Sequence, residues 1–594
     1  MSEIATKTKL NIDDTPSFVT VLHSDKLQKL GVNNIFEALD LVPGVQLKKE
    51  LTGVPVVVFR GVTQKGEVKL MIDGVTVNNS YRGSIYHFLD FPIEMVKRIE
   101  VIRGAGSVLY GSGAISGVIN IITKLSDTTM KNLLFTSIGD SKNIGSILFT
   151  NIYDFKVAID SYYHKDDNSI FVGENPSGQT GDSDRDLKDY SIGINISDEH
   201  LSFLGRIKKS DMGIAYGFLQ KLDTDTSKFH LANSTIFTQL SYKNSLNETN
   251  KITLLAGYNN YTQIGEIEHP SSAVIDTNFK EKTYFSEINL FSTSLVNNEL
   301  LVGLKYESSK TVESKWFLNS GYFKPISKPE LTRKTHSIYL NDNYSVSPTF
   351  DISAGFRYDS YSDFGDAYSP NIGLVYRISE TINFKALYSY AFRAPSWVEL
   401  TSNATLKAEK SKSLETGFIF KQNQNNILRV NLYMNTINDL ITKDVTTKKY
   451  IQNSLNKFVG TELEYIYSAN TQTELIFFSS YIKATDDNGD DLADVANILA
   501  STTLIYTTDI GFVFGSVLKY ISSSQRAADD TREDMEESFI FNQTISYMFK
   551  DFTTSLQIKD IFNSGRYYAL PPNAYETDFD DGGRVIMLKA SLEF

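Results

Sequence analysis

The chain has 594 residues and no cysteine, which excludes disulfide bonds, cysteine-ligated zinc and cysteine nucleophiles. Its formal net charge of −13 argues against nucleic-acid binding, which requires a basic surface. Aromatic residues make up 12% of the chain, and proline occurs only 13 times, a composition that favours strands. Because no apolar run reaches about 18 residues, the sequence predicts no transmembrane helix.

The N-terminal part predicts a small unit of mixed α and β structure. Its elements are a strand over residues 14–22, a helix over 34–42, a strand over 54–61 and a hairpin over 69–77. Pro43 and Gly44 end the helix, because proline cannot continue it and glycine suits the position after its end. Asp73 and Gly74 form a typical two-residue hairpin turn.

Residues 93–124 predict a helix, a strand, a glycine-rich turn and a second strand. Glycine permits positive φ angles and close backbone approach, so this segment indicates a compact, many-turned domain. A dinucleotide site is excluded by spacing. The third glycine of that fingerprint would fall at Leu109 or at Ser116, and no βαβ unit follows.

Taken in order, these segments resemble the plug domain of TonB-dependent outer-membrane receptors. The matching motifs are L-x-x-x-P-G-V at 39–45, F-R-G at 59–61, I-D-G-V at 72–75, R-I-E-V-I-R-G at 98–104 and the closing run at 110–124. The resemblance implies an all-β membrane barrel of about 22 antiparallel strands, with the N-terminal α+β plug inside its lumen.

Three regions follow from this interpretation: an N-terminal periplasmic segment at 1–14, the plug at 15–125 and the barrel at 126–594. In the third region the pattern changes to a two-residue period, as in residues 381–392, where apolar and more polar positions alternate. The final residues repeat the alternation and end on Phe594, which resembles the signal read by the barrel assembly machinery.

Two arginines in the plug, Arg60 and Arg103, stand at predicted strand ends directly before glycine. In the family, these plug arginines pair with two glutamates of the barrel wall. The resemblance assigns those places to Glu415 and Glu462, and Glu464 is a rival for the second because it lies on the same face of its strand. Such a buried pairing would hold and release the plug, and breaking it costs about 3–5 kcal/mol.

The plug segments after Gly61 and after Val77 are expected to form loops that face outward and contact a ligand. The candidate residues are Gln64, Lys65, Glu67, Asn78, Asn79, Tyr81, Arg82 and Tyr86. Arginine and tyrosine suit an anionic, aromatic chelate such as a ferric siderophore. Ordinary loop polarity explains the same residues without a ligand.

No cofactor is required by this interpretation, but calcium is possible. Asp182, Asp184, Asp186 and Asp189 could supply oxygen ligands, and similar acidic loops organise calcium in the family's cobalamin receptors. The EF-hand spacing is absent, and a solvated acidic loop is the alternative. The histidines show no metal-binding spacing, and no nucleophile or paired-carboxylate constellation indicates an enzyme.

The segment around Phe392 resembles the F-R-A-P motif of these receptors, with a degenerate N-P-x-L motif at 403–406 in which Ala404 replaces proline. Haem receptors of the family carry a histidine between the two motifs. Residues 396–402 contain none, which argues against haem.

The family couples import to an inner-membrane TonB-type protein through an N-terminal box that adds a strand to its partner. Glu3, Ile4, Ala5 and Thr6 are the candidate residues for such a box, which would be partial. The expected location is the outer membrane of a Gram-negative bacterium, with the signal peptide removed. The expected partners are therefore the TonB-type protein, the metal chelate, and outer-membrane lipid and lipopolysaccharide.

The leading hypothesis is a TonB-dependent active importer of a metal chelate, and a ferric siderophore is the favoured chelate. A cobalamin importer with calcium-ordered loops is the alternative, followed by a haem importer or a passive porin. The plug motifs that contain Arg60 and Arg103 argue against an open porin.

Overall fold

The computed structural model describes most of the chain. The described residues are 11–50, 52–62, 66–127, 131–166, 171–174, 180–183, 186–214, 230–268, 274–318, 326–327, 330–423, 425–443, 449–570 and 578–594. The candidate box at Glu3 to Thr6, together with Gln64, Lys65 and Asp184, lies outside them.

The plug is built on a five-stranded sheet in the order β1-β6-β7-β4-β5. Its strands are β1 (Phe18–His23), β6 (Val96–Arg103), β7 (Gly117–Thr123), β4 (Val68–Ile72) and β5 (Val75–Thr76). A separate hairpin pairs β2 (Val45–Lys49) with β3 (Pro55–Phe59). The short helices are α1 (Ser24–Lys29), α2 (Ile35–Leu39), α3 (Ser107–Tyr110) and the 3-10 turns η1 (Ile12–Asp14), η2 (Tyr86–Phe88), η3 (Ile93–Met95) and η4 (Lys124–Ser126).

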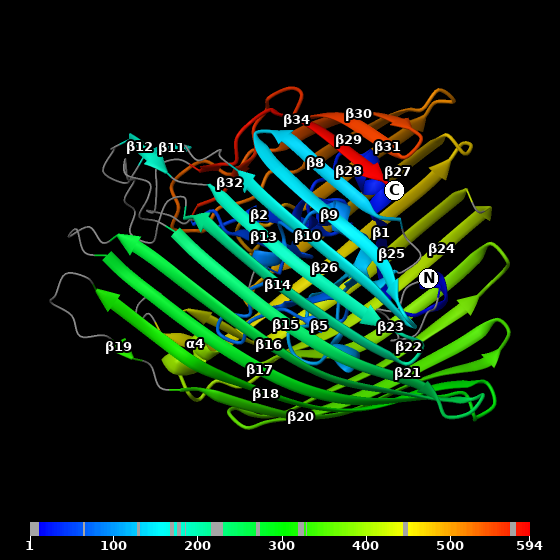
Figure 1. Cartoon of the computed structure of the whole chain (residues 1–594). Coiled ribbons are helices and arrows are strands. Elements are labelled where there is room, and N and C mark those ends of the chain that lie inside the picture. The colour runs from blue at the N-terminus through cyan, green and yellow to red at the C-terminus, as the bar shows by residue number, and fades with distance from the viewer. Residues whose placement is uncertain are drawn as a thin grey trace.

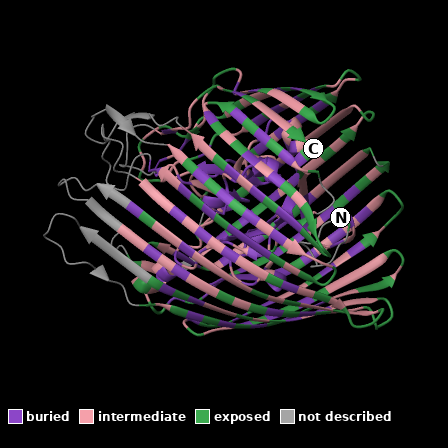
Figure 2. Cartoon of the chain, viewed as in Figure 1, coloured by how far each residue is buried: buried purple, intermediate pink, exposed green. Residues whose placement is uncertain are grey.

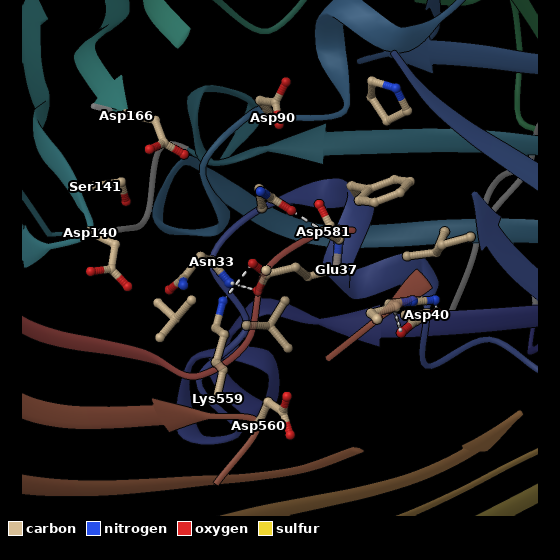
Figure 3. Close-up of a pocket in the computed structure, with 18 of the residues that line it drawn as sticks. Asn33, Glu37, Asp40, Asp90, Asp140, Ser141, Asp166, Lys559, Asp560 and Asp581 are labelled. Atoms are coloured by element: carbon tan, nitrogen blue, oxygen red, sulfur yellow. Dashed lines mark hydrogen bonds and ion pairs between the residues drawn. The ribbon is translucent and has the colours of Figure 1, made fainter. Parts of the chain in front are cut away.

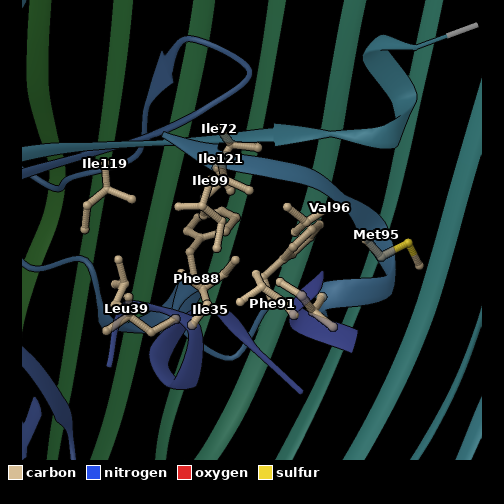
Figure 4. Close-up of a cluster of buried hydrophobic side chains, with 14 of the residues drawn as sticks. Ile35, Leu39, Ile72, Phe88, Phe91, Met95, Val96, Ile99, Ile119 and Ile121 are labelled. Carbon is tan, nitrogen blue, oxygen red and sulfur yellow. The ribbon is translucent and has the colours of Figure 1, made fainter. Parts of the chain in front are cut away.

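The plug has its own apolar core beneath this sheet (Figure 4). Ile35, Phe88, Phe91, Val96 and Ile99 are completely buried there. The predicted helix, strand and hairpin are present, and the helix is shorter than expected because it ends at Leu39. The sequence interpretation did not include α1 or β2.

Among the described residues, the wall strands form one closed antiparallel barrel of 22 strands, which confirms the predicted fold. Figure 1 shows this barrel around the plug. The wall strands are β8 (Leu133–Gly139), β9 (Ser141–Ile152), β10 (Phe155–Asp166), β13 (Leu187–Ser197), β14 (Leu201–Gly213), β15 (His230–Ser245), β16 (Asn250–Glu268), β17 (Val274–Ser292), β18 (Asn298–Leu318), β20 (Thr332–Ser347), β21 (Phe350–Tyr361), β22 (Gly365–Arg377), β23 (Ile382–Arg393), β24 (Glu409–Asn423), β25 (Asn426–Lys443), β26 (Tyr450–Ser468), β27 (Thr473–Thr485), β28 (Ile498–Thr507), β29 (Phe512–Ile521), β30 (Ser538–Phe549), β31 (Phe552–Lys559) and β34 (Val585–Glu593).

Closure occurs where β34 pairs with β8, which removes the exposed sheet edges. Several short elements lie at one end of the barrel (Figure 1). They are the hairpin of β11 (Phe171–Glu174) and β12 (Thr180–Ser183), β19 (Ile326–Ser327), α4 (Trp397–Ser402), and the pair β32 (Tyr567–Tyr568) and β33 (Phe579–Asp580). Figure 1 places the described N-terminal end and the C-terminus toward the opposite end, where strands are joined by short turns.

Burial alternates along the wall strands with the predicted two-residue period (Figure 2). In β20, Ile338 and Leu340 are exposed on the outer face, whereas Ser337, Tyr339 and Asn341 face the plug and are buried. An apolar outer face and a polar lumen suit a barrel that spans a bilayer. Within the described part of the chain, no helix is long and apolar enough to cross a membrane.

Candidate functional site at the plug and barrel interface

Arg60 and Arg103 of the plug meet Glu415 and Glu462 of the wall in one buried group, which we name the latch cluster. Arg60 donates from Nε to Glu462 Oε1 at 2.8 Å, and its NH2 lies 3.0 Å from Glu415 Oε2. Arg103 NH1 donates to Glu462 Oε2 at 2.7 Å. All four residues are at most 5% exposed, so the charges are held by one another rather than by water.

The wall strands β24, β25 and β26 present the two carboxylates side by side. Asn431 of β25, between them, donates to Glu415 at 3.3 Å and to Glu462 at 3.1 Å. The Arg60 guanidinium also lies 4.0 Å from the centroid of the Tyr433 ring. The sequence interpretation missed both residues, although each is on the lumen face of its strand.

Backbone shape explains why a glycine follows Arg103. Gly104 has a φ of +93°, and a Cβ there would lie 2.3 Å from Glu415 Oε1. A larger residue would therefore displace the carboxylate that the cluster needs. Glu464, the rival candidate, is not in the cluster: it pairs at 2.9 Å with Arg429 of β25.

A second buried group, which we name the Arg393 cluster, joins the wall to the plug segment that precedes β4. Arg393 donates to Glu409 from Nε at 2.5 Å and to Glu399 from NH1 at 3.0 Å. Glu67 of the plug is 1% exposed, and its Oε1 lies 3.2 Å from Arg393 Nε. That N–H is directed at Glu409, and neither Glu67 oxygen accepts a hydrogen bond from a described residue.

Sequence reasoning noted Arg393 only as part of a motif and missed its partners. One signal was available: Ser396 and Glu399 form a capping box at the start of α4, and the S-x-x-E spacing predicts one. The same Glu399 side chain that caps the helix also binds Arg393. No comparable local pattern connects Glu67 to Glu409.

Burial and the neighbouring Glu409 raise the pKa of Glu67 well above its ordinary value of 4.5. A carboxyl group with a raised pKa in the folded state holds its proton more tightly there than in the unfolded chain. Its contribution to stability is complete below the pKa that it has in the unfolded state, and it is lost as the pH rises through the pKa that it has in the folded state. Plug attachment is therefore expected to weaken as the pH rises above 4.5. Glu67→Gln should remove this dependence and stabilise the plug at pH 8 by roughly 1–3 kcal/mol, because an amide keeps the neutral form that burial favours at every pH. Hydrogen exchange of plug amides at pH 5 and pH 8 measures both effects, and an equal pH dependence in the two proteins would contradict the expectation.

The predicted ligand residues are less accessible than expected. Tyr81 is 8% exposed and stacks on Phe279, with ring centroids 4.1 Å apart, whereas Tyr86 is 7% exposed and donates to Asn233 at 2.9 Å. Asn79 is buried too, and Asn78 is bonded to the plug backbone at Leu70 and Val68.

The expectation of an outward surface is therefore wrong for Glu67, Asn79, Tyr81 and Tyr86. The polar groups of Asn79 and Tyr86 are hydrogen-bonded to the plug and the wall, Tyr81 stacks on a wall ring, and Glu67 is shielded from water. Of the described candidates, Asn78 and Arg82 retain partial exposure, and the Arg82 guanidinium lies 5.7 Å from the centroid of the Tyr81 ring.

The four aspartates proposed for calcium do not share one open loop. Asp189 lies within β13, is completely buried, and is ion-paired with Lys208. Its placement in a loop was wrong because the strand begins at Leu187. Asp186 lies 3.9 Å from His230, the side chain of Asp182 is outside the described part, and the described residues contain no metal-binding cluster of three or more ligands.

A cavity of about 840 Å³ separates another side of the plug from strands β9, β10, β29–β31 and β34. Many of its lining groups are charged, and Figure 3 shows Glu37 of the plug directed toward Lys559 of the wall. Lys559 Nζ donates to Glu37 at 2.5 Å, and Arg566 donates to Asp40 at 3.2 Å. Ion pairs therefore fasten this side of the plug to the wall across the cavity.

A closed strand barrel with a plug domain inside its lumen is the typical architecture of outer-membrane receptors. The family model described as TonB dependent receptor-like, beta-barrel matches residues 128–561, and the TonB-dependent receptor plug domain matches residues 11–118. The chain belongs to the TonB-dependent receptors, an outer-membrane family of Gram-negative bacteria composed of receptors and transporters rather than enzymes.

Among characterised relatives, the chain is 23% identical to the vitamin B12 transporter BtuB of Vibrio vulnificus strain CMCP6, over 67% of this chain and 64% of BtuB. It is 24% identical to the ferric enterobactin receptor PirA of Pseudomonas aeruginosa, over 66% of this chain and 61% of PirA. Both alignments thus span less than two thirds of the relative. The crystal structure of the siderophore receptor PirA from Acinetobacter baumannii superposes with a TM-score of 0.81 at 17% identity, covering 97% of this chain and 98% of that one.

Proposed function

We propose that this protein imports a ferric siderophore across the outer membrane in a TonB-dependent cycle. The observation that carries the proposal is the latch cluster, in which two plug arginines are neutralised only by wall glutamates. Release of the plug would have to break these buried ion pairs and also separate apolar side chains of the plug from wall residues such as Phe135 and Phe237, which belong to the same buried cluster.

The N-terminal end of the described plug offers a place where a pull would act first. Asp13 lies 3.1 Å from Arg429 and 2.8 Å from Lys421, both on wall strands. The candidate box at Glu3 to Thr6 precedes it in sequence, and a TonB-type partner would grip such a box by adding a strand. Force on that segment would reach the Asp13 contacts before the latch cluster.

Ferric siderophore is favoured as the ligand by two findings. Relatives and the superposed crystal structure include siderophore receptors by name. Arg82 is a partly exposed cation beside Tyr81, a pairing that suits an anionic aromatic chelate. Cobalamin is the second candidate, supported by the similarity to BtuB.

Ligand binding tests the proposal directly. Intrinsic tyrosine and tryptophan fluorescence of the detergent-solubilised protein would be titrated with ferric catecholate, ferric hydroxamate, haem and cyanocobalamin, with and without calcium. We expect sub-micromolar binding of a ferric chelate only. Calcium-dependent binding of cyanocobalamin would instead establish the second candidate, and a large open conductance in planar bilayers would contradict any plugged importer.

A further inference from the structure

Lys69, on plug strand β4, is a buried lysine without a carboxylate partner among the described residues. It is 9% exposed, and its Nζ donates to the main-chain oxygen of Tyr110. Every ion pair described for this part of the molecule leaves it out. A buried ammonium without a counter-ion is costly, so this side chain needs an explanation.

Lys69 lines a pocket of about 130 Å³ between the plug and strands β18, β20, β21 and β23. The pocket is distinct from the large cavity in Figure 3. Its remaining lining is rich in groups that donate hydrogen bonds. They include the hydroxyls of Ser80, Ser112, Thr335 and Ser396. Ser337, Asn78 and Asn79 also line the pocket, but the Ser337 hydroxyl donates to Asp359 and the two side-chain amides donate within the plug.

Four further cations face this space, and each already has a carboxylate of its own. Lys305 pairs with Glu307 at 2.8 Å, Arg357 with Asp359 at 2.7 Å, Arg333 with Asp363 at 2.8 Å and Arg393 with Glu409 at 2.5 Å. Glu307 itself lines the pocket, and Tyr110 and Tyr361 complete the titratable lining. Lys69 is therefore the one unneutralised cation among the described groups that line the pocket.

Glycine keeps the floor of the pocket open. Gly111 has a φ of +70°, and a Cβ there would lie 3.0 Å from a guanidinium nitrogen of Arg357. At Gly66, which has a φ of +83°, a Cβ would lie 3.3 Å from the Arg393 side chain. Side chains at these positions would narrow the space beside both arginines.

We propose that this pocket binds a small oxyanion, with Lys69 as its counter-ion. A volume of about 130 Å³ holds one tetrahedral oxyanion or one carboxylate and excludes an intact ferric chelate. The anion has two sources: a free inorganic ion, or an acidic group carried by a larger ligand. The site does not depend on the proposed siderophore function, because a free ion would occupy it in any receptor of this shape.

The protonation of Lys69 gives the site a pH signature. The pKa of Lys69 is lowered to about 7, mainly by burial and then by Lys305 and Arg357, against the opposing effects of Glu307 and Asp359. Anion binding requires the charged form, so the protein takes up a proton when it binds at alkaline pH. Sulfate is the best probe, because its own charge does not change over this range.

Calorimetric titration of sulfate into the detergent-solubilised protein tests the proposal. Affinity at pH 6 should exceed affinity at pH 8.5 by about thirtyfold, because the charged fraction of one group with a pKa near 7 falls by about that factor between the two pH values. Lys69→Met should weaken binding at pH 6 by at least about tenfold and abolish its pH dependence, whereas Lys69→Arg should retain binding without the pH dependence. Lys131→Met, which removes an exposed surface lysine, is the matched control and should bind sulfate normally.

The outcomes separate the two sources. Lys69-dependent sulfate binding supports a free ion. If sulfate does not bind, but a carboxylate-bearing ferric chelate binds at least tenfold more weakly to Lys69→Met than to Lys131→Met, the acidic group of a larger ligand is supported. The proposal is overturned if sulfate binds with the same affinity at both pH values and to Lys69→Met as to the unaltered protein. It is also overturned if Lys69→Met binds every tested anion as tightly as the unaltered protein does. Should Lys69→Met fail to fold, the pH dependence of the unaltered protein decides.

Discussion

Glu462→Gln is expected to weaken attachment of the plug by about 3–5 kcal/mol, because it removes one member of a buried charged group. Glu462 accepts hydrogen bonds from Arg60 at 2.8 and 3.0 Å and from Arg103 at 2.7 Å. After the substitution, two buried guanidinium groups share the single carboxylate of Glu415. Hydrogen exchange in β6, followed by mass spectrometry, should accelerate by roughly two to nearly four orders of magnitude if plug release limits it.

The matched control for this experiment is Asp551→Asn, which breaks an exposed pair with Lys131 on the barrel. Exposed pairs contribute little, so exchange in the plug should be unchanged. A Glu462→Gln protein that exchanges at the rate of the control would show that the latch cluster does not hold the plug. The substitution should also raise conductance in planar bilayers if release of the plug opens the lumen.

Arg393→Met is expected to destabilise the interface by at least about 3–5 kcal/mol at neutral pH, because three buried carboxylates would lose their cation. Arg393→Lys should recover only part of the loss, since a lysine cannot reproduce the paired contacts to Glu399 and Glu409. Protonation of the remaining acids removes their repulsion, so the damage should shrink as the pH falls.

Thermal unfolding between pH 5 and pH 8 measures this prediction. Lys410→Met is a suitable control, because Lys410 is the neighbour of Glu409 in β24 but is 61% exposed in its side chain and pairs with Asp439 at 3.5 Å. The control should unfold like the unaltered protein at each pH. A loss of stability in Arg393→Met that grows as the pH falls would refute the charge argument.

Local patterns in the sequence identified much of this architecture. The hairpin at Asp73 and Gly74 and the alternation in β23 each depend on neighbours within a few residues, and both are present in the structure. The helix predicted to end at Pro43 ends earlier, at Leu39. The two latch arginines and their glutamates were placed by resemblance to the family. Their meeting in one cluster is a matter of geometry, which the structure provides.

Other features had no local signal. Glu67 and Arg393 are brought together only because the plug occupies one particular position and orientation relative to the barrel wall. The same placement buries Tyr81 and Tyr86, which a loop composition would expose. It also leaves Lys69 without a carboxylate partner among the described residues. A one-dimensional pattern carries no information about which polar group faces which across this interface.

The sequence by itself determined the elements: glycine and proline set the turns, and the two-residue period set which face of each strand meets lipid. The tertiary structure alone decided the pairing of β34 with β8, the seat of the plug and the choice of partner for each buried charge. The physical reason is that strand periodicity is a property of adjacent residues, whereas the cost of a buried charge depends on what lies within a few ångströms of it in space.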